Sequence, residues 1–195
     1  MRILQFAVLL IGSAVLLPAA PITITYQASG AGSLNGASFA SSTFVITALG
    51  DTTNRATISP GTFAIDHGSA SINITGLGTF SFTTPTRTFV NQGAQVVGFS
   101  RAGEGGSDLL NSTSNAAYST WDLLSSIGPI TGSGSLVQWG LTPVVTSGGT
   151  LVFTDRSTTL TFRADVGNAI PEPGTFQLIA LGLLGAGLLT RFRRK

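Results

Sequence analysis

Apolar and polar residues alternate one by one through much of the chain between residues 21 and 170. In the segment 43–48, one set of alternate positions holds Phe44, Ile46 and Ala48. Successive side chains of a strand point to opposite faces, so this pattern predicts a strand with one face for a core. The same alternation predicts strands over three further segments: 70–75, 79–83 and 160–166.

Short runs rich in β-branched and aromatic residues predict additional strands. Glycine and proline separate these runs, as at Pro60-Gly61 and Gly148-Gly149. Many short strands at this spacing predict an all-β, antiparallel β-sandwich or barrel-like domain. The additional strands are expected over residues 22–26, 62–65, 86–90, 96–100, 136–139 and 150–153.

The segment 115–124 has two interpretations. Ser114 could cap a helix that carries Ala117, Trp121 and Leu124 at helical spacing. Its Thr and Tyr residues, and the Gly-Pro pair that follows at 128–129, are equally compatible with an extended segment.

The first twenty residues have a different pattern. Arg2 precedes an almost wholly apolar run, residues 3–17, and small residues follow it at Ala19 and Ala20. This order is typical of a secretory signal peptide cleaved after Ala19 or Ala20. Cleavage sites favour a small residue at the third position before the cut, and that position holds Leu17 or Pro18 here. An uncleaved membrane anchor is therefore the alternative.

The last 25 residues contain three parts in sequence. A stiff motif, Pro171-Glu172-Pro173-Gly174-Thr175, precedes an apolar run at 176–190 and a basic end at 191–195. Fifteen helical residues span about 22 Å, against about 30 Å for the hydrocarbon core of a bilayer. The cations of the basic end resist translocation across the membrane, so the apolar run is predicted to be a short transmembrane helix rather than a core helix. These cations are Arg191, Arg193, Arg194 and Lys195.

This three-part tail resembles the PEP-CTERM sorting signal of Gram-negative bacteria. The resemblance implies that an exosortase, a membrane-embedded cysteine protease-transpeptidase, recognises Pro171, Glu172, Pro173 and Gly174 and removes the tail. It also implies transient residence in the inner membrane, then delivery to the cell surface or an extracellular polysaccharide matrix. The chain is thereby divided into a signal peptide (1–20), an exported β-rich domain (21–170) and a sorting tail (171–195).

The position of the charges excludes a nucleic-acid-binding role for the middle domain. The whole chain has a net charge of +2, but five of its ten cations lie in the two end segments. Residues 21–170 hold five Arg, no Lys and seven acidic residues, hence a net charge of −2 (five minus seven), with no basic cluster. The absence of cysteine excludes disulfides and thiolate chemistry.

Candidate chemical groups in the middle domain are few. His67 is the single histidine, and Asp66 beside it would point to the opposite face of a strand, so a surface turn is favoured over catalysis. Glu104 and Asp108, in a Gly-rich segment, could supply oxygen ligands for calcium, but a solvated surface loop is the favoured interpretation. Tyr118, Trp121 and Trp139 could form a sugar-stacking surface, but core packing is the favoured interpretation of the tryptophans.

The sequence therefore predicts an exported surface or matrix protein with a structural or adhesive role in an exopolysaccharide or biofilm context. A carbohydrate- or calcium-binding module is the alternative, and a secreted hydrolase is the third interpretation. We expect no catalytic residue, metal or cofactor. The expected partners are the inner membrane, the exosortase and exopolysaccharide.

Overall fold

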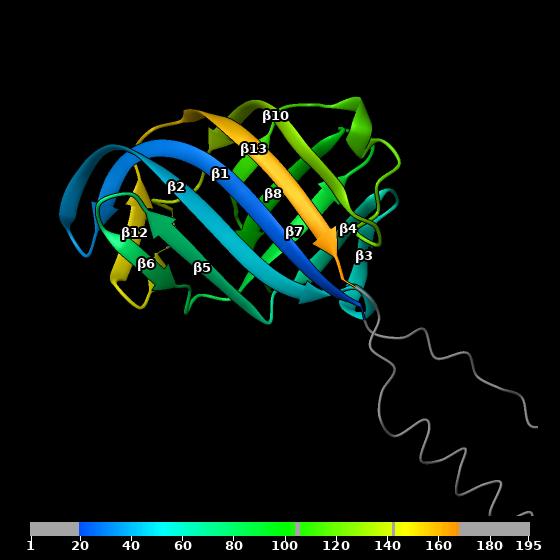
Figure 1. Ribbon diagram of the computed structural model, residues 1–195, viewed down its shortest axis with the longest axis horizontal. Helices are drawn as coiled ribbons and strands as arrows, with labels where there is room; N and C mark the ends of the chain where they lie inside the picture. Colours follow the sequence, from blue (N-terminus) through cyan, green and yellow to red (C-terminus); the bar gives the residue numbers. More distant parts are fainter. Residues whose placement is uncertain (1–19, 104–105, 142, 168–195) are drawn as a thin grey trace, which may run out of the picture.

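The computed structural model describes residues 20–103, 106–141 and 143–167. Within them the chain forms thirteen strands and two short 3-10 helices, η1 (Thr52–Asn54) and η2 (Ala116–Tyr118) (Figure 1). The strands are β1 (Pro21–Leu34), β2 (Ala37–Asp51), β3 (Arg55–Ser59), β4 (Thr62–Asp66), β5 (Ser69–Ile74), β6 (Gly78–Ser81), β7 (Thr86–Asn91), β8 (Val96–Arg101), β9 (Asp108–Ser112), β10 (Ile127–Leu136), β11 (Val144–Thr146), β12 (Gly149–Phe153) and β13 (Ser157–Val166).

All strands belong to one antiparallel sheet, in the order β3-β4-β7-β8-β9-β10-β13-β1-β2-β5-β6. β12 also pairs with β1, and β11 pairs with β12. The sheet curves back on itself, so that β13, β1, β2 and β5 lie in front of β7 and β8 (Figure 1). The Tyr26 hydroxyl on β1 donates to the Gly98 carbonyl on β8 at 3.0 Å, which joins the two layers. The predicted all-β, antiparallel domain is confirmed, and a single sheet supplies both of its layers.

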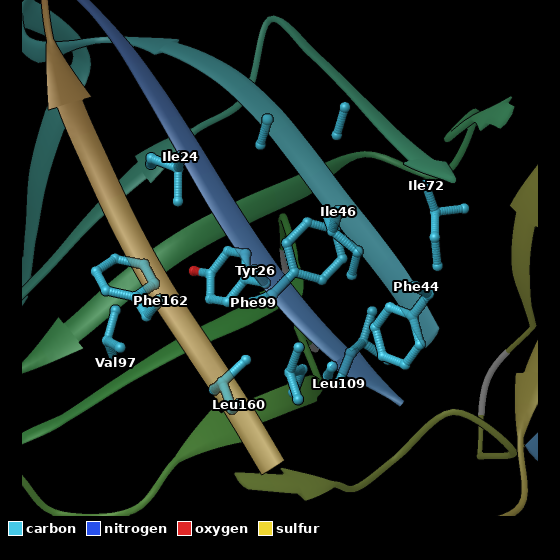
Figure 2. Close-up of a cluster of buried hydrophobic side chains, with 14 of the residues drawn as sticks. Ile24, Tyr26, Phe44, Ile46, Ile72, Val97, Phe99, Leu109, Leu160 and Phe162 are labelled. Carbon is cyan, nitrogen blue, oxygen red and sulfur yellow. The ribbon is translucent and has the colours of Figure 1, made fainter. Parts of the chain in front are cut away.

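The core lies between the layers and consists of the inward positions of the alternating strands. Ile46 and Ile72 are fully buried and Phe44 is almost so. Figure 2 shows Tyr26 between aromatic neighbours, with ring centroids 5.8 Å from Phe99 and 5.1 Å from Phe162. Burying one such side chain contributes roughly 1.5–3 kcal/mol, and so the period-two pattern determines which face of each strand packs inward.

Four strands were not predicted, because their sequences lack a clear alternation. β3 has no fully buried residue, and β10 is rich in Gly and Ser. β9 and β11 are only five and three residues long.

The strand predicted at 136–139 is wrong, because β10 ends at Leu136. Leu136 and Trp139 are buried whereas the two residues between them are exposed, so the alternation stops there. The segment 115–124 contains only the single turn η2. Its cap is Asn115, whose Oδ1 accepts from the Ala117 N–H at 2.9 Å, rather than Ser114.

Candidate functional site

The two ends of the described domain lie beside each other. Ile22, near the start of β1, pairs with Val166 at the end of β13, and the Gly167 N–H donates to the Pro21 carbonyl at 2.8 Å. Figure 1 shows β1 beginning and β13 ending at one end of the domain, with β12 at the other. The first and the last described residues, Ala20 and Gly167, therefore lie at the same end of the domain.

The predicted processing residues are mostly outside the described residues. This holds for Ala19, for the motif Pro171 to Gly174 and for the basic end 191–195, as well as for the apolar segments. Ala20 is described, and its carbonyl accepts from the Thr52 N–H at 3.0 Å. Among the residues that the structure describes, no helix has the length and apolar character needed to cross a membrane.

Of the two residues named in the calcium hypothesis, the structure describes only Asp108. Glu104 lies outside the described residues. On β9 the Asp108 carboxylate accepts a hydrogen bond from the Asn111 side-chain amide at 3.0 Å. In the three described ranges, no group of three or more His, Cys, Asp or Glu side chains is placed to hold a metal ion.

The alternative of an aromatic sugar-binding surface is wrong for all three candidate residues, and the favoured core packing of the two tryptophans is confirmed. Trp139, Tyr118 and Trp121 are 0%, 1% and 4% exposed. Trp121 packs edge-on against Phe162 at 5.5 Å, and Trp139 packs against Phe153 at 4.8 Å. Burial also raises the pKa of Tyr118 to about 12, against a smaller opposing effect of its hydrogen bond to Ser112. These rings belong to the core, where their large apolar area contributes most to stability.

The sequence favoured an open surface turn for His67, and the structure shows a different environment. This residue follows β4 and is half-buried. Its ring is stacked on the Phe99 ring, with 5.6 Å between the ring centroids and an interplanar angle of 17°. Nδ1 is 2.9 Å from the Thr86 hydroxyl and Nε2 is 3.0 Å from the Thr88 hydroxyl. Asp66 is exposed, as expected from its opposite orientation. The inward orientation follows from tertiary packing, and no local sequence signal specifies it.

The hydrogen bonds of His67 continue into the core. The Thr88 hydroxyl is also 2.9 Å from the Tyr26 hydroxyl, which donates to the Gly98 carbonyl. Thr86 and Thr88 are 3% and 0% exposed, so a substrate in solution does not reach their hydroxyls. Burial lowers the pKa of His67 to about 3, and burial likewise raises the pKa of Tyr26, against a smaller opposing effect of its bond to Thr88. The arrangement is a neutral hydrogen-bonded network that links the two layers.

A groove of about 450 Å³ is lined by residues that flank the start of β13. Figure 1 shows that β13 starts at the end of the domain opposite the one where β1 begins. The groove is formed where β10 and β12 end and β13 begins, and its lining includes Ser135, Gln138, Leu141 and Arg156. The sequence contains no motif for this groove, because common polar and aliphatic residues line it. Strand pairing brings them together, as in the register of Ser135 with Ser157.

Comparison with protein families gives a match on the tail of the chain. The model of the PEP-CTERM protein-sorting motif matches residues 169–195, which include the Pro171-Glu172-Pro173 motif and the basic end. No curated protein and no solved structure matches the chain significantly. The chain therefore carries a PEP-CTERM sorting motif at residues 169–195, and this tail supports its assignment as an exosortase substrate.

Proposed function

We propose that the chain is exported across the inner membrane of a Gram-negative bacterium, held there briefly by its tail, and cut by an exosortase near Pro171. The β domain then reaches the cell surface or the extracellular matrix, where it has a structural or adhesive role among exopolysaccharides. The sorting motif at residues 169–195 is the observation that supports this proposal.

The geometry of the domain is compatible with this route. Because β1 begins where β13 ends, an N-terminal signal and a C-terminal tail would both connect to one end. Cleavage on either side leaves the central sheet and its core intact, since strand pairing begins at Pro21 and stops at Val166. The rest of the domain surface stays free for contacts away from the membrane.

The experiment is a fractionation of two hosts, one with the sorting protease and one without it. In the first, the protein should be found at the surface or in the matrix; in the second, it should stay in the inner membrane. A variant with Pro171, Glu172 and Pro173 replaced by Ala should behave in the first host as the wild type behaves in the second. Identical distribution of wild type and variant would contradict the proposal.

A second set of variants separates recognition from membrane retention. Replacing Arg191, Arg193, Arg194 and Lys195 with neutral residues removes the charges that resist translocation. We expect these variants to lose stable insertion, whereas the motif variant stays inserted and full-length. If both sets gave inserted, full-length protein, the basic end would have no separate function in retention.

The second candidate function is a carbohydrate-binding module. The groove opposite the termini favours it, because it combines polar side chains with exposed aliphatic ones.

A further inference from the structure

The groove lies beside the start of β13, and Val166, near the C-terminal limit of the described domain, lies at the other end of this strand. β13 has ten residues, so at about 3.3 Å per residue its two ends are ~30 Å apart. Arg156 directly precedes this strand and lines the groove, whereas Val166 ends the strand and pairs with Ile22. A domain held at its termini would therefore present the groove away from the membrane.

Arg156 is the cation of the groove, and its side chain is exposed. Its guanidinium makes no side-chain hydrogen bond or ion pair with any residue that the structure describes. A guanidinium presents five N–H donors in a planar fork that matches a carboxylate. The other arginines of the described domain do have partners: Asp122 for Arg55, Ser100 for Arg87, the Pro143 carbonyl for Arg101 and Asp165 for Arg163.

The carboxylate next to Arg156 is engaged with the domain itself. Asp155 Oδ2 accepts a hydrogen bond from the Ala31 N–H on β1 at 2.7 Å. This bond directs one Asp155 oxygen toward the sheet. The second oxygen is an acceptor that a ligand hydroxyl could use. The groove therefore offers donors for an anionic group and an acceptor for a hydroxyl.

The remaining lining has polar and aliphatic parts. Leu141 is 75% exposed and Val137 is 45% exposed, which provides an aliphatic surface. Ser135, Gln138 and Thr154 provide hydroxyl and amide groups. A ring that carries a carboxylate, several hydroxyls and an apolar C–H face has the complementary chemistry, and a uronic acid is such a ring.

The backbone of the groove does not suit a peptide. The N–H groups of Leu136, Val137 and Gln138 already donate to the carbonyls of Arg156, Leu109 and Asp108. The Thr154 N–H donates to the Ala31 carbonyl at 2.9 Å. A peptide that adds as a strand requires unpaired backbone groups along an edge, and here these N–H groups are engaged.

From these observations we infer that the groove binds an acidic polysaccharide, with Arg156 contacting a sugar carboxylate and Leu141 covering the apolar face of the ring. This inference rests on the proposed function, because it names the matrix partner of the exported domain. The groove then gives the surface protein a preference for uronate-containing polymers over neutral ones.

The test uses full-length protein purified in a non-ionic detergent, titrated calorimetrically with alginate oligosaccharides, which consist of uronic acids. A hydrogen-bonded charge pair is worth enough that Arg156→Gln should weaken binding at least tenfold. Leu141→Ser should also weaken it. Arg163→Gln is the matched control, because Arg163 is an exposed arginine of β13 that pairs with Asp165, and it should leave the affinity unchanged.

Four results would overturn the inference: no binding of alginate, equal affinity for Arg156→Gln and wild type, equal affinity for alginate and neutral dextran, or displacement of alginate by a short acidic peptide. Far-UV spectra check that each variant is folded. Arg156→Gln preserves the backbone carbonyl that accepts from Leu136, so the variant should fold. If the protein is still sorted and shortened in its host but does not bind alginate, only the inference about the groove is overturned. Binding by a protein that is never sorted would overturn the proposed function alone.

Discussion

His67 should make the stability of the domain depend on pH in the range where histidine ordinarily titrates. Burial lowers its folded-state pKa from 6.5 to about 3. Above pH 6.5 the imidazole is neutral in both states, so its ionisation has no effect on stability there. As the pH falls below 6.5 the unfolded chain binds a proton and the folded one does not. The free energy of unfolding therefore decreases with acid, until the folded state is protonated at about pH 3.

The magnitude follows from the two pKa values. At pH 5.0, protonation of the unfolded state alone costs about 2 kcal/mol of stability relative to pH 7.5. With a urea dependence of about 2 kcal/mol per molar, the unfolding midpoint should move by roughly 1 M. All other ionisable groups of the chain are the same in the wild type and in a variant at position 67. Their effect cancels when the wild type is compared with His67→Gln, which has no titrating ring.

The assay is urea unfolding of a fragment spanning residues 20–167, followed by tryptophan fluorescence at pH 7.5 and pH 5.0. The wild type should lose about 2 kcal/mol more than His67→Gln between the two values. The single histidine also gives one set of imidazole NMR signals, which should not titrate between these values. Equal losses in the two proteins, or a midpoint near 6.5 in the NMR titration, would show that His67 is solvated and the network is absent.

Three further predictions concern the core and the front of the chain. Tyr26→Phe removes the hydroxyl that joins the layers and should lower the free energy of unfolding in urea by about 1–3 kcal/mol. Thr131→Val, which breaks an exposed hydroxyl pair, should lower it less. Equal losses would contradict the hydrogen bonds between the layers. Phe44→Ala should lower the free energy of unfolding by ~3–5 kcal/mol, because this side chain is 1% exposed. Phe80→Ala should lower it clearly less, because that side chain is half-buried. The reverse order would contradict the described burial. N-terminal sequencing of the surface protein should begin at Ala20 or the residue after it, and a sequence that begins at Met1 would favour the uncleaved anchor.

The class of the fold was predictable because inward and outward positions alternate in most strands. The inward residues Phe44, Ile46 and Ala48 are each at most 1% exposed, as a period-two pattern requires. Phe80 was assigned to the correct face but is only half-buried, since it lies on the edge strand β6. Strand order was not predictable, because the pairing of β1 with β13 depends on contacts between residues far apart in the sequence.

The sorting tail was predictable because its information is local: a motif, an apolar run and a basic end in fixed order. The environment of His67 was not, because its partners Thr86 and Thr88 come from another strand. The burial of Trp139 agrees with the interpretation that the sequence favoured, because large aromatic side chains are more often buried in a core than exposed on a binding surface. The groove depends on residues from the ends of three strands, and no spacing along the chain indicates it.

The C-terminal mass of protein collected from the surface of a host with the sorting protease tests the central claim most directly. The account predicts a protein shortened near Pro171, without the apolar segment and without the basic end 191–195. A surface protein that still ends at Lys195 would show that the tail is a plain membrane anchor and would contradict the sorting function.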